Sequence, residues 1–334
     1  MKQRHYNIPV FIPELACPFQ CIYCNQQKIS GRLRIPTEVE ILKSIEDHLA
    51  TIPTENSKVE LAFFGGNFTG IDKSEQIRLL KLVKPYLENG RISGIRLSTR
   101  PDYIDEETLK MLKDLGVSTI EVGAQSLDDK VLRLSKRGHN SKDTERAAKM
   151  VLKAGYSLGL QMMIGLPGDT LESAIYTANR IVELGADNTR IYPTLVIRDT
   201  VMEKMYQEER FKPLSLEEAV SWSKDLLLIF EKSDVNVIKL GLHPSEGLLS
   251  GEELIAGPFH PSFRELVLTE IWKDILKPLL IVENPGEIEI QVPHSQINYA
   301  VGYGGRNKKM LLGKFSQVKF TTDNHLSGRN FKSF

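Results

Sequence analysis

The chain has 334 residues, of which 41% are hydrophobic and 26% charged, a balance typical of a globular protein with a sizeable core. Its 43 Lys and Arg residues equal its 43 Asp and Glu residues, so any nucleic-acid binding requires a local patch rather than a global field. No run of about 18 apolar residues and no signal-peptide pattern occurs, which predicts a cytoplasmic protein without membrane association.

The first predicted strand, residues 8–12, precedes a segment that holds every cysteine of the chain, CPFQCIYCN at residues 17–25. An odd number of clustered thiols does not fit a disulfide framework, and a structural zinc site usually takes four protein ligands. Three thiolates can instead hold three irons of a four-iron–four-sulfur cluster and leave the fourth iron open. Buried structural thiols are the alternative, although the polar residues around them favour a loop: Gln20, Asn25 and Gln26.

This segment resembles the cluster motif of the radical S-adenosylmethionine superfamily. In that superfamily the open iron binds the amino and carboxylate groups of S-adenosylmethionine, and an electron from the cluster cleaves the sulfonium to give methionine and a 5′-deoxyadenosyl radical. The resemblance implies two cofactors, a 4Fe-4S cluster and S-adenosylmethionine. It places Tyr23 near the adenine and implies three catalytic, metal-binding residues: Cys17, Cys21 and Cys24.

Further along, β-branched apolar stretches alternate with amphipathic helical patterns, which predicts βα units and a parallel sheet. Five more strands are predicted at 59–64, 94–99, 118–123, 158–164 and 188–196, and helices at 37–51, 73–88, 105–115, 141–155 and 170–185. The predicted fold class is therefore α/β, with a partial (βα)6 TIM-like barrel over residues 1–212. Barrels of this kind carry their chemistry on the loops that follow the strands.

Motifs at the predicted strand ends extend the resemblance. TRPDYID, EVGAQSLDDKVLRLSKRGH, GLPGDT and RIYPTLVIRDT resemble the radical domain of the Elongator catalytic subunit family and, more distantly, oxygen-independent coproporphyrinogen oxidases. Two departures from the Elongator subunit are the closer spacing of the first two cysteines and the lack of room for its acetyltransferase domain. Carried over position by position, the resemblance implies these cofactor contacts: Gly65, Gly66, Asn67, Ser98, Gln125, Arg137 and Gln161.

Two of these positions differ from the pattern of the relatives. Ser98 stands where many of them have a ribose-binding Glu, and Gln161 where some have an Asp. Arg137 suits a carboxylate, because the guanidinium fork presents two parallel donors.

A helical extension and connector is predicted over residues 213–261, with turn-forming or pocket-edge histidines at His243 and His260. Residues 262–334 read as helix–strand–strand–helix–helix–strand, with strands at 279–283, 287–292 and 317–322. This order, with a GYGG loop between the paired helices, resembles the bacterial type of KH domain, a small α+β domain whose loop clamps a single strand. The resemblance implies RNA contacts by Gly302, Tyr303, Gly304, Gly305, Arg306, Lys308 and Lys309.

Together these patterns predict a radical S-adenosylmethionine enzyme that modifies RNA, with tRNA as the expected substrate and a transferase or oxidoreductase reaction. An electron donor such as flavodoxin or ferredoxin is the expected second partner. Three alternatives stay open: an enzyme acting on a small molecule such as a porphyrinogen, a non-catalytic iron–sulfur RNA-binding protein, and a KH-like fold used only for packing or dimerisation.

Overall fold

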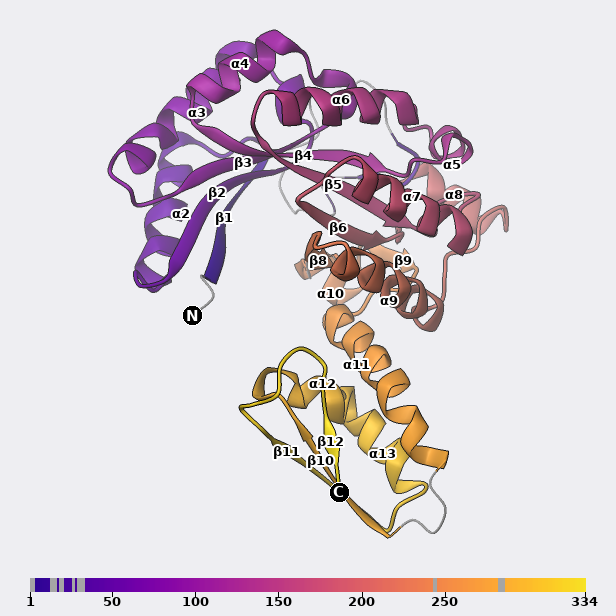
Figure 1. The fold of residues 1–334 in the computed structure, drawn as a ribbon. Helices are drawn as coiled ribbons and strands as arrows, with labels where there is room; N and C mark the ends of the chain where they lie inside the picture. The colour runs from indigo at the N-terminus through magenta and orange to yellow at the C-terminus, as the bar shows by residue number, and fades with distance from the viewer. Residues whose placement is uncertain are drawn as a thin grey trace.

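The structure is a computed structural model that describes residues 4–12, 17, 21–25, 28, 34–242, 245–281 and 286–334. Its main feature is a seven-stranded sheet in the order β1-β2-β3-β4-β5-β6-β8, in which every neighbouring pair is parallel. The strands are β1 (Arg4–Ile12), β2 (Ser57–Gly65), β3 (Gly94–Thr99), β4 (Val117–Gln125), β5 (Ser157–Ile164), β6 (Asn188–Pro193) and β8 (Asn236–Leu240). The sheet curls into an arch with one open, concave side (Figure 1).

Helices cover the convex side of the arch (Figure 1). They are α2 (Glu38–Thr51), α3 (Lys73–Glu88), α4 (Glu106–Asp114), α6 (Ser141–Lys153), α7 (Leu171–Glu183) and α9 (Leu216–Lys232). Several begin at a capping box, in which the N-cap side chain and the third helical residue bond each other's backbone N–H; Thr37 with Glu40 and Ser215 with Glu218 are examples. Alternate strand residues such as Ile8, Val10 and Ile12 are buried in the core formed with these helices.

The predicted α/β partial barrel is confirmed, but the predicted number of six strands is wrong. The seventh strand, β8, lies in the region predicted as a helical connector and extends the sheet to Leu240. Its sequence, NVIKL, does not read as a buried strand because Asn236 and Lys239 interrupt the apolar pattern. Lys239 pairs in register with Arg190 of β6. The sixth strand ends at Pro193, and the following β7 (Val196–Ile197) pairs antiparallel with β9 (Leu254–Ala256).

Helix α11 (Phe263–Leu276) connects the barrel to the C-terminal unit (Figure 1). Its first turns are buried in the barrel core through residues such as Leu266, whereas Trp272 belongs to the core of the C-terminal unit. That unit contains β10 (Glu287–Val292), α12 (Ile297–Val301), α13 (Arg306–Leu312), β11 (Gln317–Thr322) and β12 (Lys332–Ser333). Its sheet has the order β11-β10-β12, with β10 parallel to β11 and antiparallel to β12.

The strand predicted at residues 279–283 is wrong, because its described residues do not form a strand. Residues 279–281 of the predicted strand 279–283 belong to a 3-10 helix, Lys277–Ile281, which continues directly from α11; residues 282–283 lie outside the described ranges. Pro278 is compatible with a first helical turn, where no N–H is needed.

Within the parts of the chain that are described, no helix is both long and apolar enough to cross a bilayer.

The concave side of the sheet holds a buried network of charges rather than an apolar core. The Glu121 carboxylate is fully buried and accepts hydrogen bonds from Arg96 Nη1 at 2.7 Å and from Arg190 Nε and Nη2 at 2.5 and 3.0 Å. Arg96 also donates to Glu60 through Nε, at 2.9 Å. Burial opposes the ionisation of Glu121, but Arg190 and Arg96 outweigh it and hold the pKa of this carboxyl below its usual range.

Replacing the buried carboxylate should destabilise the fold strongly. We expect Glu121→Gln to lower the free energy of unfolding by about 3 kcal/mol or more, because Arg190 would stay buried without its anion. The measurement is urea unfolding followed by far-ultraviolet circular dichroism.

The matched control is Glu183→Gln, which removes an exposed partner of Arg180 and should cost less than about 1 kcal/mol. Equal effects of the two substitutions would show that the buried network contributes no more than a surface pair.

Candidate active site

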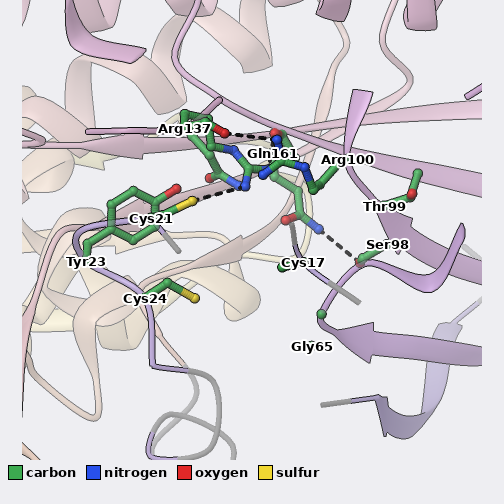
Figure 2. A pocket seen from close by; sticks show the side chains of 13 residues that line it. Cys17, Cys21, Tyr23, Cys24, Gly65, Ser98, Thr99, Arg100, Arg137 and Gln161 are labelled. Atoms are coloured by element: carbon green, nitrogen blue, oxygen red, sulfur yellow. Dashed lines mark hydrogen bonds between the residues drawn. The ribbon is translucent and has the colours of Figure 1, made fainter. Parts of the chain in front are cut away.

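A cavity of about 320 Å3 lies at the carboxyl ends of the central strands, where the cysteine segment meets the sheet (Figure 2). Every residue predicted for the cluster and for the cofactor lines this cavity, with the exception of Asn67. The lining residues are Cys17, Cys21, Tyr23, Cys24, Gly65, Gly66, Ser98, Thr99, Arg100, Gly123, Gln125, Arg137 and Gln161. The structure thus brings together residues that are separated by up to 144 positions in the sequence, from Cys17 to Gln161.

The cysteine segment is held by backbone hydrogen bonds on both sides of Ile22. Ile22 N donates to Ser135 O at 3.3 Å, and Met202 N donates to Ile22 O at 2.8 Å. A tight turn follows, in which Cys24 N donates to Cys21 O at 3.0 Å. These contacts fix where the thiols enter the cavity.

Cys21 is buried, and Cys17 and Cys24 are partly exposed. Among the described residues, no group of three or more His, Cys, Asp or Glu side chains is arranged to bind one metal ion. Thiolates of a cluster do not need to do so, because each binds a different iron.

Arg137 connects the cysteine segment to the sheet (Figure 2). It is only 7% exposed, and it donates through Nη1 to Cys21 Sγ at 3.4 Å and through Nη2 to Gly123 O at 2.9 Å. The guanidinium therefore joins the Cys21 sulfur to the end of β4.

Two buried polar atoms beside the thiols have no hydrogen-bond partner within the described parts of the chain. They are the Tyr23 hydroxyl and Arg137 Nε. Burial raises the pKa of Tyr23 well above its usual range, and the neighbouring Cys21 adds to this, so the phenol keeps its proton. Buried polar groups are normally satisfied, so these orphaned atoms fit a site built to receive a polar ligand.

The backbone has positive φ at two strand ends that line the cavity. Gly65 has φ +105°, and a Cβ at this position would lie 2.4 Å from Ile12 O, so only glycine fits. Gln125 has φ +64° and follows a bulge in β4. A left-handed non-glycine residue of this kind is costly, and such strain is concentrated at functional sites.

The floor of the cavity is joined to the buried charge network by Gln161. Its Nε2 donates to Ser98 Oγ at 3.2 Å (Figure 2) and to Glu121 Oε2 at 3.0 Å. With the amide nitrogen directed this way, the amide oxygen is the atom left to accept a hydrogen bond from a ligand.

Asn67 lies behind the cavity wall, not in it. It is 1% exposed, and its Oδ1 accepts hydrogen bonds from Thr99 Oγ1 at 2.8 Å and from Arg100 N at 3.1 Å. This arrangement joins the loops after β2 and β3. A direct cofactor contact by Asn67 stays a prediction.

Three further residues line the cavity that no sequence pattern predicted for it, Thr99, Arg100 and Gly123. The buried Arg100 guanidinium donates to both carboxylate oxygens of Asp102, at 2.9 and 2.8 Å, and to Arg137 O at 2.9 Å. The Arg-Pro-Asp run after a predicted strand was the available signal, since a buried Arg requires a partner of this kind.

The residues predicted to bind RNA do not line the cavity and lie in the C-terminal unit. Gly302 is buried, Gly305 is partly exposed, and the exposed residues are Tyr303, Gly304, Arg306, Lys308 and Lys309. The loop is fastened to α11, because Tyr303 N donates to Thr269 Oγ1 at 2.9 Å and Asn307 Nδ2 donates to Thr269 O at 3.0 Å. The Tyr303 ring also meets the His260 ring edge-on, with centroids 5.2 Å apart; His243 lies outside the described residues.

Comparison with known proteins identifies the class. The model of the Radical SAM superfamily matches residues 12–181, and that of the Radical_SAM C-terminal domain matches residues 186–273. The chain belongs to the radical SAM superfamily, whose cofactors are a 4Fe-4S cluster and S-adenosylmethionine.

Individual relatives show which members of the superfamily this chain is similar to. A tRNA uridine(34) acetyltransferase of Dehalococcoides mccartyi is 27% identical over 241 residues, which cover 62% of this chain and 52% of the relative. The heme chaperone HemW of Bacillus subtilis is 26% identical over 215 residues, covering 63% of this chain and 55% of HemW. This chain therefore spans about half the length of these relatives.

A solved structure confirms the fold: Methanocaldococcus infernus Elp3 superimposes with a TM-score of 0.66 at 23% identity, over 83% of this chain and 64% of that one. The predicted resemblance to the radical domain of the Elongator catalytic subunit family is confirmed.

The cavity geometry predicts a specific effect of removing the Arg137 guanidinium. We expect Arg137→Ala to weaken S-adenosylmethionine binding at least about tenfold, because a lost charge-assisted contact costs about 1.5–3 kcal/mol. Equilibrium dialysis with radiolabelled S-adenosylmethionine, on protein of matched iron content, measures this.

The control is Arg146→Ala, which removes an arginine from the exposed face of α6. Unchanged affinity in the Arg137 variant would mean that this side chain serves only to pack the cysteine segment against β4.

Proposed function

We propose that this protein is a radical S-adenosylmethionine enzyme that modifies RNA, with tRNA as its substrate. The observation that carries the enzymatic part is the cavity in which three thiols, the Arg137 guanidinium and the strand-end glycines converge. In this proposal the metal ligands are Cys17, Cys21 and Cys24.

The lining residues fit the two cofactors by their chemistry. When bound, the cluster and S-adenosylmethionine supply one-electron reduction and the removal of a hydrogen atom from the substrate. Arg137 offers Nε to a carboxylate, Gln161 offers an acceptor oxygen to a hydroxyl group, and the Tyr23 hydroxyl offers a donor. Gly65 and Gly66 leave the backbone open to close approach.

An apolar cluster excludes water from one side of the Cys21 thiol. Ile22 and Tyr23 are buried with Val131, Leu166 and Met202 in a small apolar cluster behind the cavity. Exclusion of water protects a reactive intermediate from side reactions.

The RNA substrate is supported by two observations of different kinds. One relative is named a tRNA uridine(34) acetyltransferase, although this chain covers only 52% of it. The C-terminal unit presents a glycine-rich loop followed by exposed Arg306, Lys308 and Lys309 in a chain with no net charge. Glycines without side chains let phosphates approach, and the basic side chains attract them.

A small-molecule substrate is the competing proposal, because HemW is similar over a comparable share of the chain. A non-catalytic iron–sulfur protein would not need the strained Gln125 backbone or the orphaned polar atoms next to the thiols.

The cluster can be tested directly. Anaerobically reconstituted protein should bind about four irons and four sulfides per chain and cleave S-adenosylmethionine when dithionite is added. Cys17→Ala, Cys21→Ala and Cys24→Ala should each abolish both properties, measured by iron analysis and by chromatography of 5′-deoxyadenosine. Cleavage retained by any of the three variants would contradict the assignment.

The C-terminal loop should control RNA affinity without affecting the cofactor. Gly304 has φ +61° with open space around it, so Gly304→Asp introduces a negative charge together with local backbone strain, and Gly304→Ala is the control for the strain alone. Replacing Lys308 and Lys309 by Ala should flatten the salt dependence of binding by about 0.7 per lost phosphate contact.

The measurement is tRNA gel shift over a salt series, with dithionite-driven cleavage of S-adenosylmethionine assayed in parallel. Cleavage should be unchanged in these variants. Wild-type tRNA affinity in the Asp and the Lys variants, or no tRNA binding by the unmodified protein, would favour the small-molecule substrate.

A further inference from the structure

One row of side chains crosses the concave side of the sheet, from the cavity to the last strand. Gln161 of β5, Arg190 of β6 and Lys239 of β8 are in register on three neighbouring strands. Residues in register on adjacent strands face the same side of a sheet. Gln161 lines the cavity and Arg190 bonds the Glu121 carboxylate on the concave side, so Lys239 faces that side as well. Its backbone lies roughly 10 Å from that of Gln161, two strand spacings away.

Lys239 is a partly buried cation without a partner. Its amine forms no hydrogen bond and no ion pair within the described parts of the chain, whereas Gln161 and Arg190 of the same row both bond Glu121. Burial lowers the pKa of Lys239, and the nearby Arg190 adds to this. Buried charges are normally paired, so this amine fits a position that receives an acceptor from a ligand.

The carboxylates around Lys239 do not supply that acceptor. Glu265 of α11 acts on Lys239 by its charge but forms no ion pair with it, and the neighbouring Arg264 acts in the opposite direction. Both oxygens of Glu121 already accept from other side chains. His5, which bonds Glu60, carries no negative charge in either protonation state. Counted at full charge, the cations outnumber the carboxylates: Lys58, Arg96, Arg190, Lys239 and Arg264 against Glu60, Glu121 and Glu265.

Three partly exposed apolar side chains flank these donors. The guanidinium carbon of Arg190 lies 4.6 Å from the centroid of the Phe64 ring. Met163 and Tyr192 are in register two residues further along β5 and β6, and Met163 also packs against the apolar cluster that contains Cys21. Aromatic and thioether groups of this kind suit contact with a flat ring. We define the β6–β8 surface as Phe64, Met163, Arg190, Tyr192 and Lys239.

The strand that carries Lys239 also contacts the loop proposed to bind RNA. Gly241, which follows β8, and His260 line one small hollow at the carboxyl ends of β6 and β8. The His260 ring meets the Tyr303 ring of the loop edge-on. Figure 1 shows β8 at the end of the arch nearest the C-terminal unit. Lys239 therefore lies between that loop and the cofactor cavity.

We propose that Lys239 is a substrate-binding residue, and that the β6–β8 surface receives a flat ring whose oxygen atoms accept hydrogen bonds from its amine. This rests on the proposed function, since it places the substrate beside the cofactor cavity. Keto oxygens on a base of RNA and carboxylates on a small ring compound both offer this chemistry. Because Arg190 and Lys239 have only donors, the surface disfavours a ring that presents an amino group to them.

The test is amine labelling of the anaerobically reconstituted protein with N-hydroxysuccinimidyl acetate, quantified for each lysine by peptide mass spectrometry. The two probes are unmodified tRNA transcripts and coproporphyrin, a tetracarboxylate. At a probe concentration about ten times its Kd, the labelling rate of Lys239 should fall about tenfold, because only the unoccupied protein reacts. Protection by tRNA assigns the acceptor to a base, and protection by coproporphyrin assigns it to a carboxylate.

The internal control is Lys149, an exposed lysine of the convex helix α6, whose labelling should not change. Labelling of Lys239 that neither probe slows, or that slows only together with Lys149, would overturn the proposal. Protection of Lys308 and Lys309 by tRNA without protection of Lys239 by either probe would also overturn it, while leaving RNA binding by the loop intact.

Substitution separates a binding role from a structural one. Lys239→Met should weaken binding of the protecting probe at least about tenfold in calorimetry, because a charge-assisted contact is lost, and Lys239→Arg should retain most of the affinity. The Tm of Lys239→Met should be unchanged or raised, because an unpaired cation beside Arg190 does not stabilise the fold. Lys149→Met is the matched control and should bind like the unmodified protein.

A lowered Tm of Lys239→Met with unchanged probe affinity would overturn the proposal and assign Lys239 to the fold. A failure of the proposed function is distinguishable, since the unmodified protein would then not cleave S-adenosylmethionine with dithionite. The labelling of Lys239 does not depend on that cleavage.

Discussion

The contact on which the rest of the site depends is the one between the buried Arg137 guanidinium, the Cys21 sulfur and the Gly123 carbonyl. It joins the described part of the cysteine segment, residues 21–25, to the end of a central strand. Because a buried guanidinium needs several acceptors, the position of Arg137 is fixed only when both the thiol and the strand end are in place. The hydrogen bonds of Arg137 therefore form together only when the cysteine segment is in its correct position.

A second set of contacts positions the backbone of Arg137. Arg100 donates to the Arg137 carbonyl and is itself clamped by Asp102, while Asn67 accepts from the Arg100 backbone. The loops after β2, β3 and β4 thus form one hydrogen-bonded unit. Such supporting contacts hold the residues that bind a ligand in a single arrangement.

Much of this arrangement was predictable, and for physical reasons. Three thiols at close spacing leave few alternatives to a cluster, and the alternation of βα patterns leaves few alternatives to a parallel sheet. The seventh strand was not predictable in this way, because Lys239 and Asn236 interrupt its apolar pattern. The cause is tertiary: the concave side carries charges, so Lys239 lies beside Arg190 where an apolar residue would be expected.

The role of Asn67 shows the same limit at a single residue. Its place in a Gly-Gly-Asn run after a strand suggests ligand contact, but its amide oxygen faces Thr99 and the Arg100 backbone. Which side of a loop a polar residue faces depends on partners that are far away in the sequence. Likewise, the predicted strand at 279–283 was based on apolar residues, but its described residues continue the helical path of α11 through Pro278.

The chain as a whole is neutral, so the basic loop of the C-terminal unit is informative by its position. The loop before α13 has glycines in left-handed backbone geometry, an exposed Tyr303 and three basic side chains, and it is fastened to α11 instead of to the cavity. Open backbone with an aromatic ring suits a phosphate chain with bases to stack. Because the first turns of α11 are buried in the barrel core through residues such as Leu266, a single helix joins this loop to the domain that carries the cavity.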